Sequence, residues 1–423
     1  MWDVIRATGG PGDDFDFFAS VDPIGEWSVP AALEALSDFL GRHAVLRCSV
    51  TVDEHGEPFQ HVLEAGSLCI RVMSCDGVES PEVSATPLVR GEMPCTALLG
   101  IAGDHVKRVV FRVSHVVMDR WGRDLLQREL ARFFEQPAEA RLLPPAPSPL
   151  DLAAYENSDR GRALQDRSLE FFKSLYRSAP ATMFPQPLSD GETPRFWFGE
   201  YRSAPLRRAL NTIRDTHGID RLGVIAGTLA SVVADTASVS SALIFTISNN
   251  RFDAAWDNYA GSMAQEAVLL LPIRDSLIAT MRDAATLSLR SLQRARYCPR
   301  RLADERARVE EERGVEFDKV GRALVLNLMS GTSGDLPVDD TASGAPTFTW
   351  TGKTDAENLA LYLDAYDDDD VFVLRVRLDT RRHSPAFAQH LLETMGWAIV
   401  AAADADLPQD AVSRQLSRGW VRA

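Results

Sequence analysis

The spacing of apolar residues predicts a mixture of short strands and amphipathic helices in the first part of the chain. In some stretches apolar and polar residues alternate, as they do in a strand that is buried on one face. In others, apolar residues recur every three or four positions, and Pro30 stands where a helix can begin. The elements predicted in this way are strands at 15–21, 45–52, 60–63, 97–102 and 106–113 and helices at 31–43 and 123–134.

The remainder of the chain continues this mixture without the strict strand–helix alternation of a parallel sheet. We therefore predict an α+β fold with two lobes rather than a parallel barrel or a doubly wound sheet. The predicted helices are 150–177, 204–217, 222–236, 277–297 and 385–401, and the predicted strands are 195–201, 241–247, 268–271, 323–329, 359–366 and 372–378.

A proline-rich stretch separates the two predicted lobes. Five prolines stand between Pro137 and Pro149, where neither periodicity is clear. A chain of 423 residues is also too long for one typical domain. We predict an N-terminal lobe at 1–149 and a C-terminal lobe at 150–423, of which 150–194 is a connecting helix and proline-rich linker.

Composition and charge narrow the classes of partner. With 45% apolar and 25% charged residues the chain is typical of a globular protein, and 45 basic against 60 acidic residues give a net charge of −15. That sign disfavours a nucleic-acid partner. The five cysteines form no CxxC pair, so we expect reduced thiols and no metal site. No stretch has the pattern of a leader peptide or a membrane span, and we expect a cytoplasmic monomer without a membrane partner.

Candidate chemistry lies at the end of the predicted strand 106–113. His115 follows this strand, and Asp119 stands four residues later. An imidazole titrates near neutral pH, so a histidine beside a carboxylate can act as a general base. The same spacing also fits a half-buried histidine at a strand end followed by an aspartate that caps the next helix, and spacing alone leaves both interpretations open.

The order of several short motifs resembles the condensation domains of nonribosomal peptide synthetases and their free-standing acyltransferase relatives. In that family a helix end reads RHExLR, a strand is followed by HHxxxDG, and a later turn reads NR. The resemblance extends from about residue 15 to residue 400. The matching positions are Arg42, His43, Leu46 and Arg47, then Ser114 to Arg120, then Asn250 and Arg251, and more loosely Ala260 to Met263.

The resemblance implies two lobes like chloramphenicol acetyltransferase, which form a V with a central tunnel. His115 would be the catalytic base as an amine or alcohol attacks an acyl thioester. The thioester would arrive on the phosphopantetheine arm of an acyl or peptidyl carrier protein, or on coenzyme A, and no cofactor would be bound intrinsically. Asp119 would be structural and would pair with Arg251. The tunnel and substrate positions would be Ser114, Arg120, Trp121 and Gly261.

Two departures from the family pattern leave a second interpretation open. Ser114 stands where the family usually has a first histidine, and Arg120 replaces the motif glycine. Some members of the superfamily keep the fold without the reaction and recruit a carrier protein or a tailoring enzyme such as an oxygenase. The chain is therefore interpreted first as an acyltransferase in specialised metabolism and alternatively as a non-catalytic recruiting domain.

A cluster of arginines gives a further candidate surface. Carrier proteins are typically acidic, so such a cluster could bind one. The alternative is a solvated helix face whose charge is balanced by nearby glutamates. The cluster consists of Arg290, Arg294, Arg296, Arg300, Arg301, Arg306 and Arg308.

Overall fold

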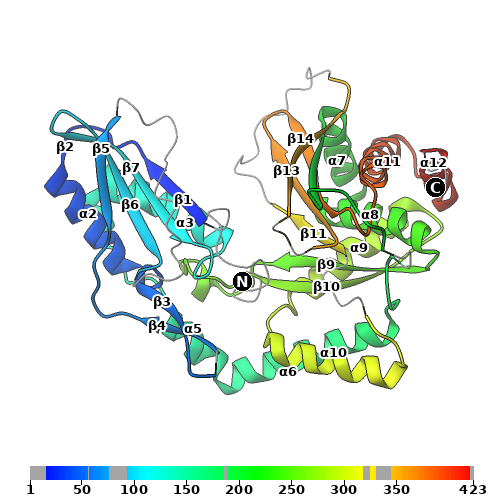
Figure 1. Cartoon of the computed structure of the whole chain (residues 1–423), viewed down its shortest axis with the longest axis horizontal. Helices are drawn as coiled ribbons and strands as arrows, with labels where there is room; N and C mark the ends of the chain where they lie inside the picture. The colour runs from blue at the N-terminus through cyan, green and yellow to red at the C-terminus, as the bar shows by residue number, and fades with distance from the viewer. Residues whose placement is uncertain are drawn as a thin grey trace. The chain divides into compact units, whose positions relative to one another are not determined.

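The computed structural model describes residues 16–55, 57–75, 93–184, 188–317, 324–329, 344–355, 357 and 359–419 (Figure 1). These residues fall into two compact units. The first unit extends to Arg162 and takes in Arg251–Ala264, and the second contains Ala163–Asn250 and the chain from Gln265 onward. Strands and helices are mixed in both units, which confirms the predicted α+β class.

The first unit is built on an antiparallel sheet with one parallel edge. Its strand order is β1-β7-β6-β5, with the short β2 also paired to β7, and only β5 runs parallel to its neighbour. A separate hairpin, β3–β4, corresponds to the predicted pair of strands, but residues 45–47 of the first predicted strand form a 3₁₀ helix instead. The strands are β1 (Asp16–Val21), β2 (Trp27–Ser28), β3 (Cys48–Val52), β4 (Pro58–Val62), β5 (Ile70–Ser74), β6 (Cys95–Ala102) and β7 (His105–Ser114).

Helices α2 and α3 cover this sheet with their apolar faces. The hydroxyl of Ser28 caps α2, and that helix buries Leu36 and Phe39 in a core shared with Phe111 of β7. Such capping satisfies a backbone N–H that the first turn leaves unpaired. The helices of this unit are α2 (Val29–Arg42), η2 (Ala44–Arg47), α3 (Arg120–Glu135), α4 (Pro137–Ala140), α5 (Pro149–Glu156), the start of α6 (Asp159–Ser178) and η5 (Ala254–Trp256).

The second unit is built on a larger mixed sheet. Its strand order is β10-β9-β11-β13-β14-β8-β12, and β11 runs parallel to both of its neighbours. The strands are β8 (Phe196–Ser203), β9 (Ser241–Ser248), β10 (Gln265–Pro272), β11 (Leu324–Leu328), β12 (Thr347–Thr354), β13 (Leu361–Asp368) and β14 (Val371–Asp379).

Helices of the second unit pack against this sheet and against one another (Figure 1). Helix α8 is buried along most of its length, because Gly223 and Gly227 allow it to lie directly against Ala285 and Met281 of α9. The helices are α7 (Ala204–His217), α8 (Arg221–Ala237), α9 (Leu277–Leu292), α10 (Pro299–Arg313), α11 (Pro385–Asp404) and α12 (Gln409–Gly419), together with the rest of α6.

The division between the units differs from the predicted boundary at 149/150. Helix α5 belongs to the first unit, and so does the segment 251–264, which the prediction assigned to the C-terminal lobe. The reason is a small apolar cluster in which Tyr155 of α5 packs edge-on against Trp256. The periodicity of apolar residues along the chain cannot predict this contact, because the two aromatic residues are far apart in sequence.

Several elements depart from the periodicity that predicted them. The expected helix 150–177 is interrupted after Glu156, where Ser158 begins a new turn with its hydroxyl bonded to the N–H of Gly161. The expected helix 277–297 ends at Leu292, and α10 follows it. Helix α10 was missed because only Leu302 and Val309 of its residues are buried.

Candidate functional site

The carboxylate of Asp119 lies at the centre of a dense set of hydrogen bonds in the first unit. Asp119 is 1% exposed and precedes the first residue of α3, where it accepts the N–H of Gly122 at 2.8 Å. The guanidinium of Arg251 binds both carboxylate oxygens, at 2.9 and 3.0 Å. The N–H groups of Met263 and Ala264 complete the set at 2.8 and 3.0 Å. All of these partners are donors, and the carboxylate oxygens accept from every one of them.

The other end of this ion pair holds the segment 251–264. Arg251 also donates to the carbonyl of Tyr259 at 3.2 Å and to that of Gly261 at 2.7 Å. The N–H of Ser262 donates to the carbonyl of Val117 at 2.9 Å. The segment is thus fastened to the turn that carries the HxxxD residues, and the expected pairing of Asp119 with Arg251 is present.

His115 occupies the turn between β7 and α3. Its Nδ1 lies 2.7 Å from the carbonyl oxygen of Met118. A carbonyl only accepts, so Nδ1 carries the proton, and in the neutral ring Nε2 holds a lone pair. Within the described part of the chain no residue hydrogen-bonds to Nε2. The ring of Phe17 packs against the imidazole with 4.5 Å between ring centroids.

The surroundings favour the neutral form of His115. Burial lowers the pKa of His115 below its ordinary value of 6.5, and the hydrogen bond to Met118 offsets this only in part. At neutral pH the imidazole is therefore unprotonated and able to accept a proton.

The remaining predicted site residues take different places around this turn. Ser114 is buried at the end of β7, where its hydroxyl accepts the N–H of Val116 at 3.3 Å. Arg120 begins α3 and its Nε lies 4.0 Å from the carboxylate of Asp124. Trp121 follows it and is half-buried. Gly261 is buried, and its role in the site is to offer its carbonyl to Arg251.

The motif at the end of α2 forms a second buried ionic cluster. Arg42 binds Glu129 of α3 through two bonds of 2.6 and 2.9 Å, and Nε2 of His43 lies 2.7 Å from the same carboxylate. Burial raises the pKa of Glu129, but the hydrogen bonds to Arg42 and His43 outweigh it and lower this pKa to about 2. The cluster joins α2 to α3, so these motif residues act on the fold of the first unit.

Three neighbours of the site were not predicted from the sequence. A Cβ on Gly122 would lie 1.9 Å from the carbonyl oxygen of Ala260, so this glycine lets α3 touch the segment 251–264. The guanidinium of Arg112 in β7 is buried and binds Asp16 of β1 at 2.7 Å. Phe17 follows Asp16 and packs on His115. The available signal for this pair was the apolar run at 109–113, which Arg112 interrupts.

Neither a metal cluster nor a membrane span is found in the part of the chain that the structure describes. No group of three or more histidine, cysteine, aspartate or glutamate side chains is placed there to hold a metal ion. No described helix combines the length and the apolar character that crossing a bilayer requires.

Comparisons with known sequences point to peptide synthetases. No family model matches the chain. A protein named as a probable nonribosomal peptide synthetase, CymA of Salinispora arenicola, is 28% identical over 157 residues, or 37% of this chain. Cyclosporin synthetase of Tolypocladium inflatum is 23% identical over 289 residues, or 62% of this chain. The matched regions are about 2% of either relative, so the activities of those whole proteins belong to much longer chains.

Solved structures with the same fold cover nearly the whole chain. A condensation domain for chain release from the enacyloxin polyketide synthase has a TM-score of 0.65 and 17% identity, over 97% of this chain and 80% of that one. The first condensation domain of the CDA synthetase has a TM-score of 0.62 and 14% identity, over 97% and 95%. The X-domain of teicoplanin biosynthesis, solved in complex with OxyB, has a TM-score of 0.65 and 16% identity, over 95% and 92%. At these identities the likeness establishes the fold.

Proposed function

We propose that this condensation-like domain is an acyltransferase that forms an amide or ester bond from a thioester donor, with His115 as its base. The observation that carries the proposal is the bonding of the imidazole. Its Nδ1 is engaged by the carbonyl of Met118, and its lowered pKa keeps Nε2 free of a proton at neutral pH. A general base needs this protonation state and a fixed orientation.

The proposed step moves one proton through Nε2 of His115. An amine or alcohol attacks the thioester carbonyl carbon while Nε2 accepts its proton, which gives a tetrahedral intermediate. Collapse of that intermediate breaks the carbon–sulfur bond, and the departing thiolate takes the proton back from Nε2. The imidazole ends the cycle neutral, and Met118 holds Nδ1 during the brief positive charge because its carbonyl accepts a hydrogen bond in either state.

In this mechanism Asp119 has a structural role. Its oxygens already accept five hydrogen bonds from Gly122, Arg251, Met263 and Ala264, so the carboxylate is fully engaged. We assign it to the shape of the turn that presents His115, together with Arg251 and Gly261. Ser114, Arg120 and Trp121 flank the same turn and are proposed to adjoin the substrate.

The donor is proposed to be an acyl group on a carrier protein's phosphopantetheine arm, with coenzyme A as the other source of the same thioester. The similarity to peptide synthetases and to a condensation domain that releases a polyketide chain supports this choice. The acceptor is proposed to be a small amine or alcohol, reached through a tunnel as the family resemblance implies.

The proposal is tested by intact-mass measurement of acyl transfer from a loaded carrier protein to a panel of amines and alcohols. We expect His115→Ala to lower turnover by about a hundredfold or more, since a positioned base contributes ~10²–10⁴-fold. His61→Ala is the matched control, because His61 is exposed in β4, and it should keep full activity. Equal turnover in wild type and His115→Ala would remove the base role.

A non-catalytic recruiting domain is the second candidate, and two observations favour it. Arg120 places a long cation where the motif has glycine, and the similar X-domain was solved in complex with OxyB. The variant Arg120→Gly separates the candidates in the same assay. Turnover by wild type supports the transferase, whereas no turnover by wild type or by Arg120→Gly, together with binding of a carrier protein, supports the recruiting domain.

A further inference from the structure

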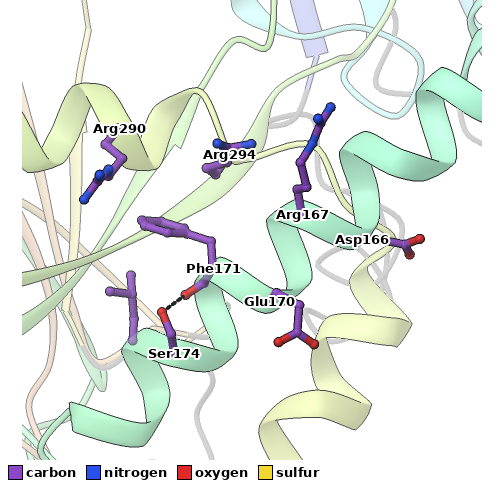
Figure 2. Close-up of a pocket in the computed structure, with 8 residues that line it drawn as sticks. Asp166, Arg167, Glu170, Phe171, Ser174, Arg290 and Arg294 are labelled. Carbon is purple, nitrogen blue, oxygen red and sulfur yellow. Dashed lines mark hydrogen bonds between the residues drawn. The ribbon is translucent and has the colours of Figure 1, made fainter.

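A groove of about 650 Å³ lies in the second unit, between α6 and α9 (Figure 2). Its apolar lining comes from Phe171 and Leu175 of α6, which are both half-buried. Figure 2 shows the ring of Phe171 pointing toward α9, between Arg290 and Arg294. The groove therefore combines an apolar floor with cations along one side, and it is open to solvent along its length.

The three cations that line the groove have no partner in the part of the chain that the structure describes. They are Arg167, Arg290 and Arg294, and none of them forms an ion pair or a side-chain hydrogen bond there. The two lining carboxylates are engaged or turned away. Asp166 binds Arg301 at 2.8 Å, and Glu170 points to the side of α6 away from α9 (Figure 2). The groove thus presents positive charge, although the chain as a whole carries −15.

The other arginines of the predicted cluster do not share this property. Most of them are neutralised by neighbours, which agrees with the interpretation as a charge-balanced helix face. Of this cluster only Arg290, in the last turn of α9, and Arg294, two residues beyond the end of that helix, line the groove. The engaged members are Arg296 with the carbonyl of Asn250, Arg301 with Asp166, Arg306 with Glu310 and Arg308 with Glu305.

We propose that this groove binds an acidic amphipathic helix of a partner protein. An apolar stripe on that helix would cover Phe171 and Leu175, and carboxylates beside the stripe would pair with Arg290 and Arg294, as in other helix-in-groove interfaces. A small anion is the less suitable occupant, because small-molecule sites enclose most of their ligand and this groove is open. The inference concerns a surface of the second unit and is independent of the chemistry proposed for His115.

The test uses a defined probe, a fluorescein-labelled helical peptide with leucines at i, i+3, i+4 and i+7 and glutamates on both flanks. Fluorescence anisotropy measures its binding to the whole chain at low and high salt. We expect saturable binding that weakens with salt, and at least about tenfold weaker binding of a twin peptide in which lysine replaces every glutamate. Equal binding of the two peptides, or none by the acidic one, overturns the proposal.

Substitutions then place the peptide in the groove. We expect Arg290→Glu and Arg294→Glu each to weaken binding by about tenfold, while Arg282→Glu, an exposed change on the same helix outside the groove, leaves it unchanged. His115→Ala should bind the peptide as wild type does, so the two proposals fail separately.

Equal binding by Arg282→Glu and Arg290→Glu overturns the site. Two other outcomes would show that the groove binds something other than an acidic helix. One is displacement of the peptide by coenzyme A at equal concentration, and the other is a dimer in sedimentation that Arg290→Glu converts to monomer.

Discussion

His115 and Asp119 stand four residues apart on one turn of the first unit, yet their surroundings are opposite in kind. The carboxylate of Asp119 accepts five hydrogen bonds and is 1% exposed. Among the described residues, the imidazole of His115 has one hydrogen-bond partner, the carbonyl of Met118 at Nδ1, and it is packed against Phe17. One residue of the motif is thus fully engaged in structure, and the other keeps a ring nitrogen available.

This difference is consistent with different roles for the two residues of the motif, a structural one for Asp119 and the proposed proton-accepting one for His115. A carboxylate that is surrounded by donors has no lone pair left for a substrate proton, and losing any donor would leave charge unpaired in a buried place. An imidazole with one fixed nitrogen keeps a known tautomer and can still exchange a proton at the other. Asp119 thus fixes the turn that carries His115, the residue proposed as the base.

The largest expected effect is on folding, from Asp119→Ala. Removing one partner of a buried ion pair leaves Arg251 uncompensated and typically costs about 3–5 kcal/mol of unfolding free energy. The segment 251–264 would lose its anchor to α3 at the same time. Urea unfolding followed by circular dichroism measures this loss, with a lower yield of folded protein as its first sign.

The control for that measurement is Asp124→Ala, on the same helix. Asp124 is partly exposed and pairs with Arg123 at 2.7 Å, and a surface pair of this kind is worth at most about 1 kcal/mol. If Asp119→Ala unfolds at the same urea concentration as wild type but has no activity, then Asp119 takes part in the chemistry and the contrast with His115 is wrong.

The next effect tests the contact that closes the Asp119 network. In Gly122→Ala the new methyl would lie 1.9 Å from the carbonyl oxygen of Ala260, which belongs to the backbone and cannot rotate away. We expect a loss of about 3 kcal/mol, the upper end for overpacking. Gly41→Ala is the matched control, because nothing lies within 4 Å of its Cβ position in α2, and it should be neutral or slightly stabilising. Equal stability of both variants would show that α3 and the segment 251–264 separate easily.

Much of this arrangement could be predicted from the sequence, because it is local or because it follows the family motifs. The strand that ends at Ser114 and the helix that buries Leu36 and Phe39 show clear periodicity. The comparisons confirm the resemblance to condensation domains, which the motif order first indicated. The pairing of Asp119 with Arg251 came from that resemblance alone, since the residues are 132 positions apart.

What the sequence did not predict depends on contacts between distant segments. Gly122 looks like any glycine until Ala260 is placed against it, and the pairing of Arg112 with Asp16 requires the register of β1 on β7. The boundary near residue 149 was drawn from prolines, whereas the packing of Tyr155 on Trp256 decides where the first unit ends. Neither composition nor local pattern predicts contacts of this kind between distant residues.

A buried histidine outside the site tests whether burial alone sets the protonation of an imidazole here. Burial lowers the pKa of His383 to about 3. The charge of Arg382 lowers it further by a smaller amount, and the charge of Asp379 acts in the opposite direction. Its ring packs between Phe184 and Phe387. The folded state resists protonation and the unfolded state accepts it near 6.5, so stability is present above that pH and is lost as the pH falls toward 3.

We expect His383 to account for about 2 kcal/mol of the stability lost between pH 7 and pH 5. Urea unfolding of wild type and His383→Phe at both pH values measures this difference, and the comparison within each variant removes any cost of repacking. His55→Ala, at an exposed position, should keep the pH dependence of wild type. A His383→Phe variant that loses as much stability on acidification as wild type would show that the ring is not the source.

The smallest expected effect concerns Phe17 and the available nitrogen of His115. If burial holds the pKa of His115 below 6.5, then removing the ring that covers it admits water and raises that pKa toward 6.5. The acid limb of acyl transfer would then move upward in Phe17→Ala, because the base is protonated at a higher pH. Phe18→Ala is the control, since Phe18 points to the other face of β1 and is 40% exposed.

The same shift should appear in the NMR titration of the imidazole without substrate. A fall in turnover with an unmoved limb would instead mean that Phe17 contacts the substrate. An acid limb that moves downward would contradict the explanation that burial lowers the pKa of His115.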